Sequence, residues 1–211
     1  MIAVVDVCGG NLRSVQRALE KVGAKVTVTR DPETVRRADK IVVPGQGAFG
    51  VFMRSLEERG LGEALREGIS SGRPYLGICL GLQILFDTSE EQGFGTQSRD
   101  RLVAGLGVLP GEVVRLRPSD ARLKVPHMGW NRVIRRSPEP MLDGIAEDAH
   151  VYFVHSFHAV PRDPSLITLE ADHGVPVTAA IRKDHLFACQ FHPEKSQAVG
   201  LRILQNFVER T

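Results

Sequence analysis

The stretch Gly77-Ile78-Cys79-Leu80-Gly81 places a cysteine between two glycines, where an apolar run meets a run with helical spacing. Residues 74–78 read as a short buried strand, and the apolar residues of 80–86 recur with the spacing of a helix. A strand that turns sharply into a helix exposes the turn residue at the sheet edge, and flanking glycines relieve crowding there. A helix N-terminus also favours thiolate, the nucleophilic form of cysteine. The stretch therefore predicts a nucleophile elbow.

A second motif, His192-Pro193-Glu194, follows the apolar run 186–190 and offers a base for this thiol. Cysteine nucleophiles need a base, and histidine is the usual one. A carboxylate two residues later can orient the imidazole and stabilise its protonated form. Cys79, His192 and Glu194 are therefore predicted to form a catalytic triad. Taken singly, they also fit a buried cysteine, a capping or core histidine and a solvated first-turn acid.

The combination resembles the class I, or triad, glutamine amidotransferases, whose fingerprint is a Gly-x-Cys-x-Gly elbow followed by His-Pro-Glu. A third element of that family, a glycine-rich turn, matches Pro44-Gly45-Gln46-Gly47 after the strand-like residues 40–43. The resemblance implies that the oxyanion is stabilised by backbone N–H groups of Gln46, Gly47 and Leu80. Backbone donors suit this role because they are fixed in place before charge develops. No cofactor and no metal are expected.

Three further segments, 10–14, 124–131 and 152–157, resemble the glutaminase subunits of imidazole glycerol phosphate synthases. The likeness spans nearly the whole chain, and Pro-His-Met-Gly-Trp-Asn at 126–131 is its most specific part. The resemblance implies that glutamine is bound by Gln83, His155, Ser156 and Phe157. It also implies positions at the subunit interface and tunnel mouth for Asn11, Trp130, Tyr152 and Lys195. Without the family, those four read as a helix cap, a hydrophobic plug, a core aromatic and a surface lysine.

The resemblance implies an activity that needs a partner. The chain would hydrolyse L-glutamine to glutamate and ammonia through a γ-glutamyl thioester on Cys79. The ammonia would pass to a separate (β/α)₈-barrel synthase subunit, in a heterodimer that makes imidazole glycerol phosphate and an aminoimidazole carboxamide ribotide in histidine biosynthesis. A sheltered route is reasonable because ammonia in neutral water is mostly ammonium, which is not nucleophilic. The isolated chain is expected to turn over glutamine poorly.

Three other functions stay open on the sequence. The chain could be the glutaminase of a different synthase, in an anthranilate or pyridoxal phosphate pathway, although the 126–131 hexapeptide argues against this. It could be a catalytically silent module that only binds a partner, which the intact Cys79, His192 and Glu194 disfavour. A free-standing thiol hydrolase of the same fold is the third, and it would not need the interface-like segments.

Composition agrees with one cytoplasmic domain spanning residues 1–211. The chain has 42% hydrophobic and 25% charged residues, and it shows no Pro- or Ser-rich linker and no internal repeat. No apolar stretch reaches the roughly 18 to 20 residues of a membrane span, and the N-terminus lacks the features of a signal peptide. A net charge of +2 is too small to indicate nucleic-acid binding. The densest basic patch, Arg115, Arg117, Arg122 and Lys124, reads first as solvated surface, and the alternative is a patch that faces a partner or lies near a phosphorylated substrate.

The three cysteines are odd in number and lack metal-type spacing, so they predict neither a disulfide framework nor a zinc site. Cys8 and Cys189 are expected to be small buried hydrophobes.

The order of elements predicts an α/β fold with a mostly parallel central sheet, helices on both faces, and antiparallel strands added in the second half. Helices are expected at 12–22, in pieces between 52 and 69, after the elbow over 80–86, and at 199–209. The hexapeptide 126–131 is expected to lie in a loop. The predicted strands are 2–7, 25–29, 40–43, 75–78, 108–116, 131–134, 151–155, 166–171, 177–182 and 186–190.

Overall fold

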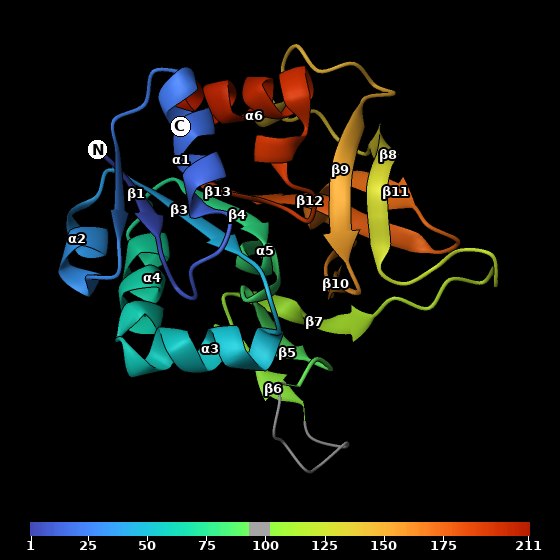
Figure 1. The fold of residues 1–211 in the computed structure, drawn as a ribbon, viewed down its shortest axis with the longest axis horizontal. Helices are drawn as coiled ribbons and strands as arrows, with labels where there is room; N and C mark the ends of the chain where they lie inside the picture. The colour runs from blue at the N-terminus through green and yellow to red at the C-terminus, as the bar shows by residue number, and fades with distance from the viewer. Residues whose placement is uncertain (93–101) are drawn as a thin grey trace.

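The computed structural model describes residues 1–92 and 102–211, and its centre is a mixed nine-stranded sheet (Figure 1). The strand order is β2-β1-β3-β4-β13-β12-β11-β8-β9; the first five are mutually parallel, and every later pairing is antiparallel. The strands are β1 (Ile2–Val5), β2 (Val26–Thr29), β3 (Lys40–Gly45), β4 (Tyr75–Cys79), β8 (His127–Arg135), β9 (His150–His155), β11 (Ile167–Asp172), β12 (Pro176–Lys183) and β13 (Leu186–Cys189).

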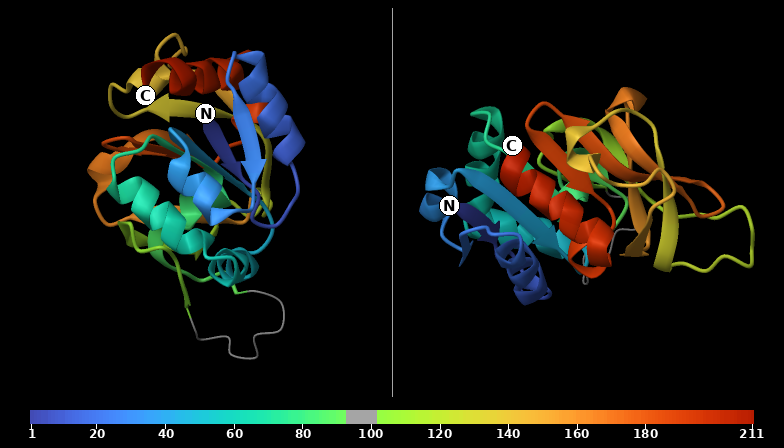
Figure 2. Two further views of the ribbon diagram at one scale, coloured as in Figure 1. Left: turned by 90° about the vertical axis from the view of Figure 1, so that its left-hand side faces the viewer. Right: turned by 90° about the horizontal axis from the view of Figure 1, so that it is seen from above.

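Helices cover both faces of the parallel half. Figure 2 shows α1 (Leu12–Lys21) and α6 (Gln197–Arg210) side by side on one face. The other face carries α2 (Pro32–Arg37), α3 (Phe49–Glu58) and α4 (Leu61–Ser70). Successive strand side chains point to opposite faces, so each strand feeds two cores. Val42 packs in the cluster beneath α1 and α6, whereas Val43 packs in the cluster beneath α3 and α4. The predicted α/β class is confirmed.

In the view of Figure 1, a second sheet lies below the first, and the sequence analysis did not predict it. Its order is β10-β7-β5-β6, with β10 (Phe157–Pro161), β7 (Leu109–Arg115), β5 (Phe86–Ser89) and β6 (Val103–Ala104). The helix expected over 80–86 is correspondingly too long, because α5 covers only Leu80–Gln83 and Phe86 already begins β5. Every residue from Leu80 to Phe86 is buried, so hydrophobic periodicity could not mark where the helix ends.

Two other predictions are wrong. The hexapeptide 126–131 is not a loop, since all but its first residue lie in β8. Cys8 is exposed, and only Cys189 is the buried hydrophobe that was expected. The short helix α2 was also missed. Among residues 1–92 and 102–211, no helix combines the length and the apolar character that a membrane crossing requires.

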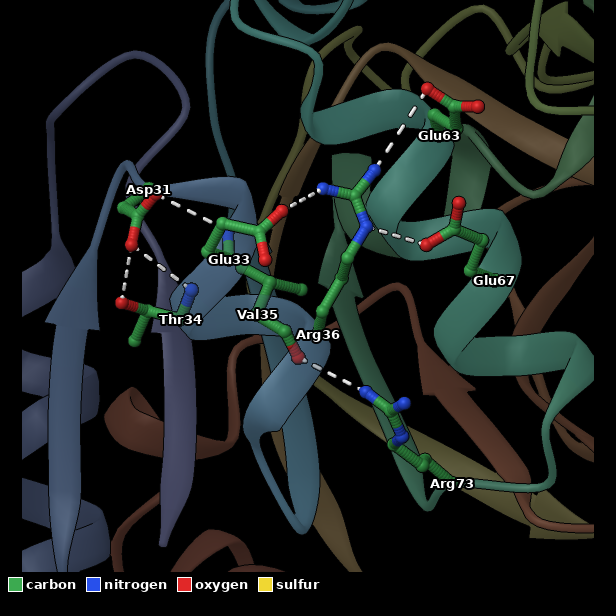
Figure 3. Close-up of polar contacts among 8 residues, drawn as sticks. All are labelled: Asp31, Glu33, Thr34, Val35, Arg36, Glu63, Glu67 and Arg73. Carbon is green, nitrogen blue, oxygen red and sulfur yellow. Dashed lines mark hydrogen bonds and ion pairs between the residues drawn. The ribbon is translucent and has the colours of Figure 1, made fainter.

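The start and anchoring of α2 follow from its side chains (Figure 3). Asp31 accepts hydrogen bonds from the backbone N–H groups of Glu33 and Thr34, and Pro32 fixes the first-turn backbone. Arg36 then donates to Glu67 of α4 at 2.6 Å and to Glu33 at 2.7 Å. These contacts hold α2 against α4.

Candidate active site

The elbow forms as the sequence predicts. β4 ends at Cys79 and α5 begins at Leu80, and Cys79 has φ 56° and ψ −107°, a conformation that L-residues rarely adopt. The flanking glycines are required by close packing. A Cβ on Gly77 would lie 2.3 Å from the carbonyl oxygen of Gly81, and one on Gly81 would lie 1.8 Å from that of Val43. Only glycine at both positions allows the helix to leave the strand so tightly.

His192 and Glu194 come to this elbow from the neighbouring strand. β13 pairs with β4 in parallel, with Cys189 opposite Ile78, so the two strands end at the same sheet edge. Directly after β13, His192 Nδ1 lies 2.7 Å from Glu194 Oε1. His192 and Cys79 line one cavity, and Cys79 is 7% exposed. The three residues predicted as a triad are therefore brought together.

Electrostatics around His192 favour its protonated form. Burial lowers the pKa of His192, but hydrogen bonds with the side chains of Cys79 and Glu194 outweigh that effect and raise it. Asn11 Nδ2 donates to the same Glu194 oxygen at 2.7 Å. The Asn11 side chain makes no capping bond to α1, so it belongs to the site and is not a helix cap.

The cavity has a volume of about 420 Å³ and opens beside the sulfur. All seven residues predicted for the oxyanion turn and the glutamine site line it, together with Lys195. These seven are Gln46, Gly47, Leu80, Gln83, His155, Ser156 and Phe157. Gln46 extends toward the loop before α1, because a Cβ on Gly10 would lie 2.2 Å from Gln46 Nε2. The sequence prediction thus collected residues from four separate segments, 46–47, 79–83, 155–157 and 192–195, into one wall.

Two residues of the site were missed. Gln190, fully buried at the end of β13, donates from Nε2 to Cys79 Sγ at 3.5 Å. Glu91 lines the cavity and accepts a hydrogen bond from the Phe49 backbone N–H at 2.9 Å. Burial raises the pKa of the Glu91 carboxyl, and the Phe49 hydrogen bond partly offsets this. Glu91 follows another acid after a strand, a pattern that reads as solvated surface.

Three of the four residues predicted for a partner interface, Trp130, Tyr152 and Lys195, lie side by side, and we call them the aromatic row; the fourth, Asn11, contacts Glu194 instead. Trp130 of β8 and Tyr152 of β9 are directly opposite each other, with ring centroids 6.2 Å apart in an edge-on arrangement. Lys195 Nζ lies 5.6 Å from the centre of the Tyr152 ring. Trp130 is 47% exposed and Met128, two residues earlier, is 63% exposed. Two large apolar side chains are therefore exposed side by side on one face of β8.

The family model described as glutamine amidotransferase class-I matches residues 3–211. The chain belongs to the class I glutamine amidotransferases. As expected for an enzyme of this family, the amidotransferase has a thiol and an imidazole, those of Cys79 and His192, in the wall of one cavity, and the Glu194 carboxylate is hydrogen-bonded to His192. Across the described part of the amidotransferase, no three His, Cys, Asp or Glu side chains are grouped so that they could hold a metal ion.

Two relatives that are about half identical to this amidotransferase carry the same name. The imidazole glycerol phosphate synthase subunit HisH of Syntrophotalea carbinolica is 50% identical, over 98% of each chain. That of Synechococcus sp. (strain JA-3-3Ab) is 49% identical over 99% of the amidotransferase and 93% of the relative. Among solved structures, a chain of PurLQS from Thermotoga maritima superposes with a TM-score of 0.73, at 18% identity, covering 98% of the amidotransferase and 96% of that chain. The last likeness concerns the fold alone.

Proposed function

We propose that this amidotransferase is the glutaminase subunit of an imidazole glycerol phosphate synthase. The observation that carries the proposal is that Cys79 and His192 line one cavity beside the glycine-rich turn, with Glu194 hydrogen-bonded to His192 Nδ1. The high identity to relatives of that name along nearly the whole chain supports the choice of synthase. The reaction consumes glutamine and water and yields glutamate and ammonia. We place it in the cytoplasm, as the biosynthetic relatives suggest.

In the proposed mechanism, Cys79 Sγ attacks the side-chain carboxamide carbon of glutamine while His192 holds the thiol proton. The negative charge that develops on the carboxamide oxygen is met by backbone N–H groups of the Gln46–Gly47 turn and of Leu80. His192 gives its proton to the departing nitrogen, and ammonia leaves a γ-glutamyl thioester on Cys79. His192 then takes a proton from water, whose oxygen attacks the thioester carbon and releases glutamate and the thiol.

The cavity offers groups that suit the other end of glutamine. Glu91 is the one carboxylate among the residues that line it in the described part of the chain, so we assign it the substrate α-ammonium. Gln83 Oε1 is buried and has no hydrogen-bond partner among the described residues, which leaves it as an acceptor for a substrate N–H. Ser156 offers a hydroxyl. His155 has both ring nitrogens in hydrogen bonds within the protein, so it holds the wall in place and has no ring nitrogen free to hydrogen-bond glutamine.

We further propose that a (β/α)₈-barrel synthase subunit binds the aromatic row and receives the ammonia. Asn11, Trp130, Tyr152 and Lys195 would lie at that interface. The Gln46–Gly47 turn abuts the loop that ends at Asn11, so a partner touching this loop would act on both the turn and Glu194. The isolated chain would then be a poor glutaminase that the ligand-bound partner stimulates strongly.

The test compares two nitrogen sources in the assembled complex. With glutamine, Cys79→Ala should lower synthase activity by at least about a thousandfold, because no nucleophile remains. With added ammonium salt, the same complex should keep the wild-type rate. Cys8→Ala, which removes an exposed thiol outside the cavity, is the matched control and should change neither activity. Retention of glutamine-dependent activity by Cys79→Ala would contradict the mechanism, and failure to assemble with the synthase subunit would contradict the partner.

A further inference from the structure

A row of polar side chains, of which the two histidines are buried, connects β8 to the cavity, and we call Asn131, His127 and His155 the histidine relay. Asn131 Nδ2 lies 3.1 Å from His127 Nε2, and His127 Nδ1 lies 3.0 Å from His155 Nε2. His155 Nδ1 lies 2.9 Å from the carbonyl oxygen of Phe157, in the cavity wall. Both histidines are buried, with exposures of 3% and 6%. The relay therefore runs through the protein interior to the wall.

The hydrogen bonds of the relay have one possible assignment of donors and acceptors, and each end of the relay fixes that assignment independently. At the inner end, the Phe157 carbonyl can only accept, so His155 carries its proton on Nδ1 and accepts at Nε2. At the outer end, Asn131 Nδ2 also donates to the Asp172 carbonyl at 2.8 Å, while Asn131 Oδ1 accepts from the Arg132 N–H. His127 Nε2 is then an acceptor, and its proton lies on Nδ1. Both ends therefore make His127 Nδ1 the donor and His155 Nε2 the acceptor of the bond between the two rings.

Both rings must be neutral for this arrangement, since a protonated imidazole has no acceptor. Burial lowers the pKa of His127 to about 4, with a smaller effect from neighbouring His173. Burial, followed by the charge of His127, lowers the pKa of His155 to about 3. The rings of Phe153 and His173 stack on His127 at 4.5 and 4.1 Å between centroids and shield it from water. Each ring thus carries one proton at neutral pH.

The Phe157 carbonyl is the point where the relay meets the catalytic residues. It accepts a second hydrogen bond from Gln83 Nε2 at 2.9 Å, and the same nitrogen donates to Gln190 Oε1 at 2.9 Å. Gln190 in turn donates to Cys79 Sγ at 3.5 Å. Because both hydrogens of the Gln83 amide are used, its Oε1 has a fixed direction. A displaced Phe157 carbonyl would therefore move the Gln83 side chain.

We propose that the histidine relay is a positioning device for the glutamine site: it fixes the Phe157 carbonyl and, through it, the Gln83 carboxamide. The proposal rests on the assignment of this cavity to glutamine. This role requires residues 127–131 to be extended, because alternate side chains of a strand point to opposite faces of the sheet. His127 and Asn131 face the relay on one side of β8. Met128 and Trp130 are exposed on the other side, where Trp130 belongs to the aromatic row. One strand thus serves the substrate wall and the surface proposed for the partner.

The first test reads the relay directly in the full-length chain. Nitrogen-15 NMR of histidine rings at neutral pH distinguishes a protonated from an unprotonated ring nitrogen. We expect His127 and His155 both to carry the proton on Nδ1. His127→Phe should change the ring-nitrogen signals of His155, because its Nε2 loses a donor. Either ring found with its proton on Nε2, or found charged, would overturn the relay.

The second test is kinetic and uses the complex with the synthase subunit. His127→Phe keeps an aromatic ring between Phe153 and His173 but removes both relay bonds, so KM for glutamine should rise at least about tenfold. The kcat should change by less than about threefold, since the triad is untouched. His173→Phe is the matched control, because His173 stacks on the same ring but bonds only the Lys124 carbonyl. It should leave KM within about twofold.

The outcomes separate this proposal from the proposed function. An unchanged KM in His127→Phe, with wild-type glutamine hydrolysis intact, overturns the positioning role alone. An equal rise of KM in His127→Phe and His173→Phe also overturns it, because packing would then be the cause. If the wild-type complex hydrolyses no glutamine, the proposed function fails, and the tautomers still report whether the relay exists.

Discussion

Cys79 holds a strained backbone conformation, φ 56° and ψ −107°, and such strain costs about 1–3 kcal/mol. The residue stays there because its surroundings leave no alternative. Gly77 and Gly81 pack against backbone atoms that no Cβ could approach, and β4 is hydrogen-bonded on both sides by β3 and β13. Strain imposed by a rigid sheet is how a nucleophile is fixed before substrate arrives.

A prediction at the scale of one residue concerns Gln190. Gln190→Leu removes the donor to Cys79 Sγ and leaves a Gln83 N–H without its acceptor. We expect kcat/KM for glutamine to fall about 10- to 100-fold, corresponding to one lost buried hydrogen bond with an unpaired partner. The matched control is Gln205→Leu, since the Gln205 amide bonds only Glu209 along α6. Steady-state kinetics of the complex measure both, and equal rates for the two variants would contradict the role.

The sequence was sufficient for residues whose type and spacing carry chemistry. Cys79, His192 and Glu194 stand in motifs, so the order of residues along the chain identifies them. Gln190 and Glu91 could not be identified in this way, because their roles depend on which strand ends lie side by side. An amide or a carboxylate beside a sulfur has no signature along the chain.

At the scale of elements, α6 packs closely on the turn that holds His192 and Glu194. A Cβ on Gly200 would lie 1.8 Å from the carbonyl oxygen of Pro193, and backbone cannot yield as a side chain can. Gly200→Ala should therefore destabilise the fold by about 1–3 kcal/mol and lower kcat by displacing His192 and Glu194. Gly62→Ala in α4 is the control, because its Cβ would meet only the mobile Glu57 carboxylate.

Gly62→Ala is expected to be neutral or to stabilise by up to about 1 kcal/mol, since alanine suits a helix better. Urea unfolding gives both free energies of unfolding. Equal stability of the two variants would show that α6 can shift without cost.

Lys40, the first residue of β3, binds the C-terminal end of α6. Its ammonium donates to the carbonyl oxygens of Phe207 and Val208 in the last turn of α6, where carbonyls lack an intrahelical partner, and to the backbone oxygen of Thr211 just beyond it. Lys40→Met should lower the free energy of unfolding by about 1–2 kcal/mol, because a cation is lost from the negative end of the helix dipole.

The control for Lys40 is Lys21→Met, which removes an exposed lysine in the last turn of α1. It should change stability by less than about 0.5 kcal/mol. Chemical unfolding monitored by circular dichroism compares the two variants. A similar loss in both would mean that Lys40 acts only as one more surface charge.

Elements were predictable where their hydrophobic pattern is periodic, as in α1 and α6. The pattern failed over 80–86, where every side chain is buried whatever the local structure. It also failed at 126–131, because glycine, proline and one exposed tryptophan imitate a loop while the chain pairs with β9 as a strand. Pairing between distant segments decided that case, and no local window contains it.

At the scale of the whole molecule, sheet order builds the site. β1, β3, β4 and β13 are adjacent and parallel, so the loop to Asn11, the Gln46–Gly47 turn, Cys79 and His192 all leave the sheet at one edge. Ligand sites of open α/β sheets lie at this carboxyl edge. The alternation of elements predicted a parallel sheet, but nothing in the sequence analysis predicted which strands are neighbours.

The whole fold should also lose stability in acid because it buries neutral histidines. Burial lowers the pKa of His127 and His158 to about 4 and that of His155 to about 3, whereas an unfolded histidine titrates near 6.5. Between these values the unfolded chain binds more protons, so the free energy of unfolding decreases as pH falls. The stability associated with these three neutral histidines is fully present above pH 6.5 and is lost progressively as the pH falls toward 3.

The pKa of His192 is shifted in the opposite direction, upward, so its effect on stability with pH has the opposite sign. Together the four histidines predict a stability maximum near pH 6.5. Its raised pKa stabilises the fold fully below 6.5, and this contribution disappears as pH rises through the folded value. Below the maximum, each depressed histidine adds a slope of up to about 1.4 kcal/mol per pH unit. Denaturant unfolding from pH 4.5 to 8.5 measures the curve. His158→Leu should reduce the acid slope by about one proton, because His158 Nδ1 is buried without a partner among the described residues and leucine does not titrate. A flat wild-type curve below pH 6.5, or an unchanged slope in the variant, would show that these rings are hydrated in the folded protein.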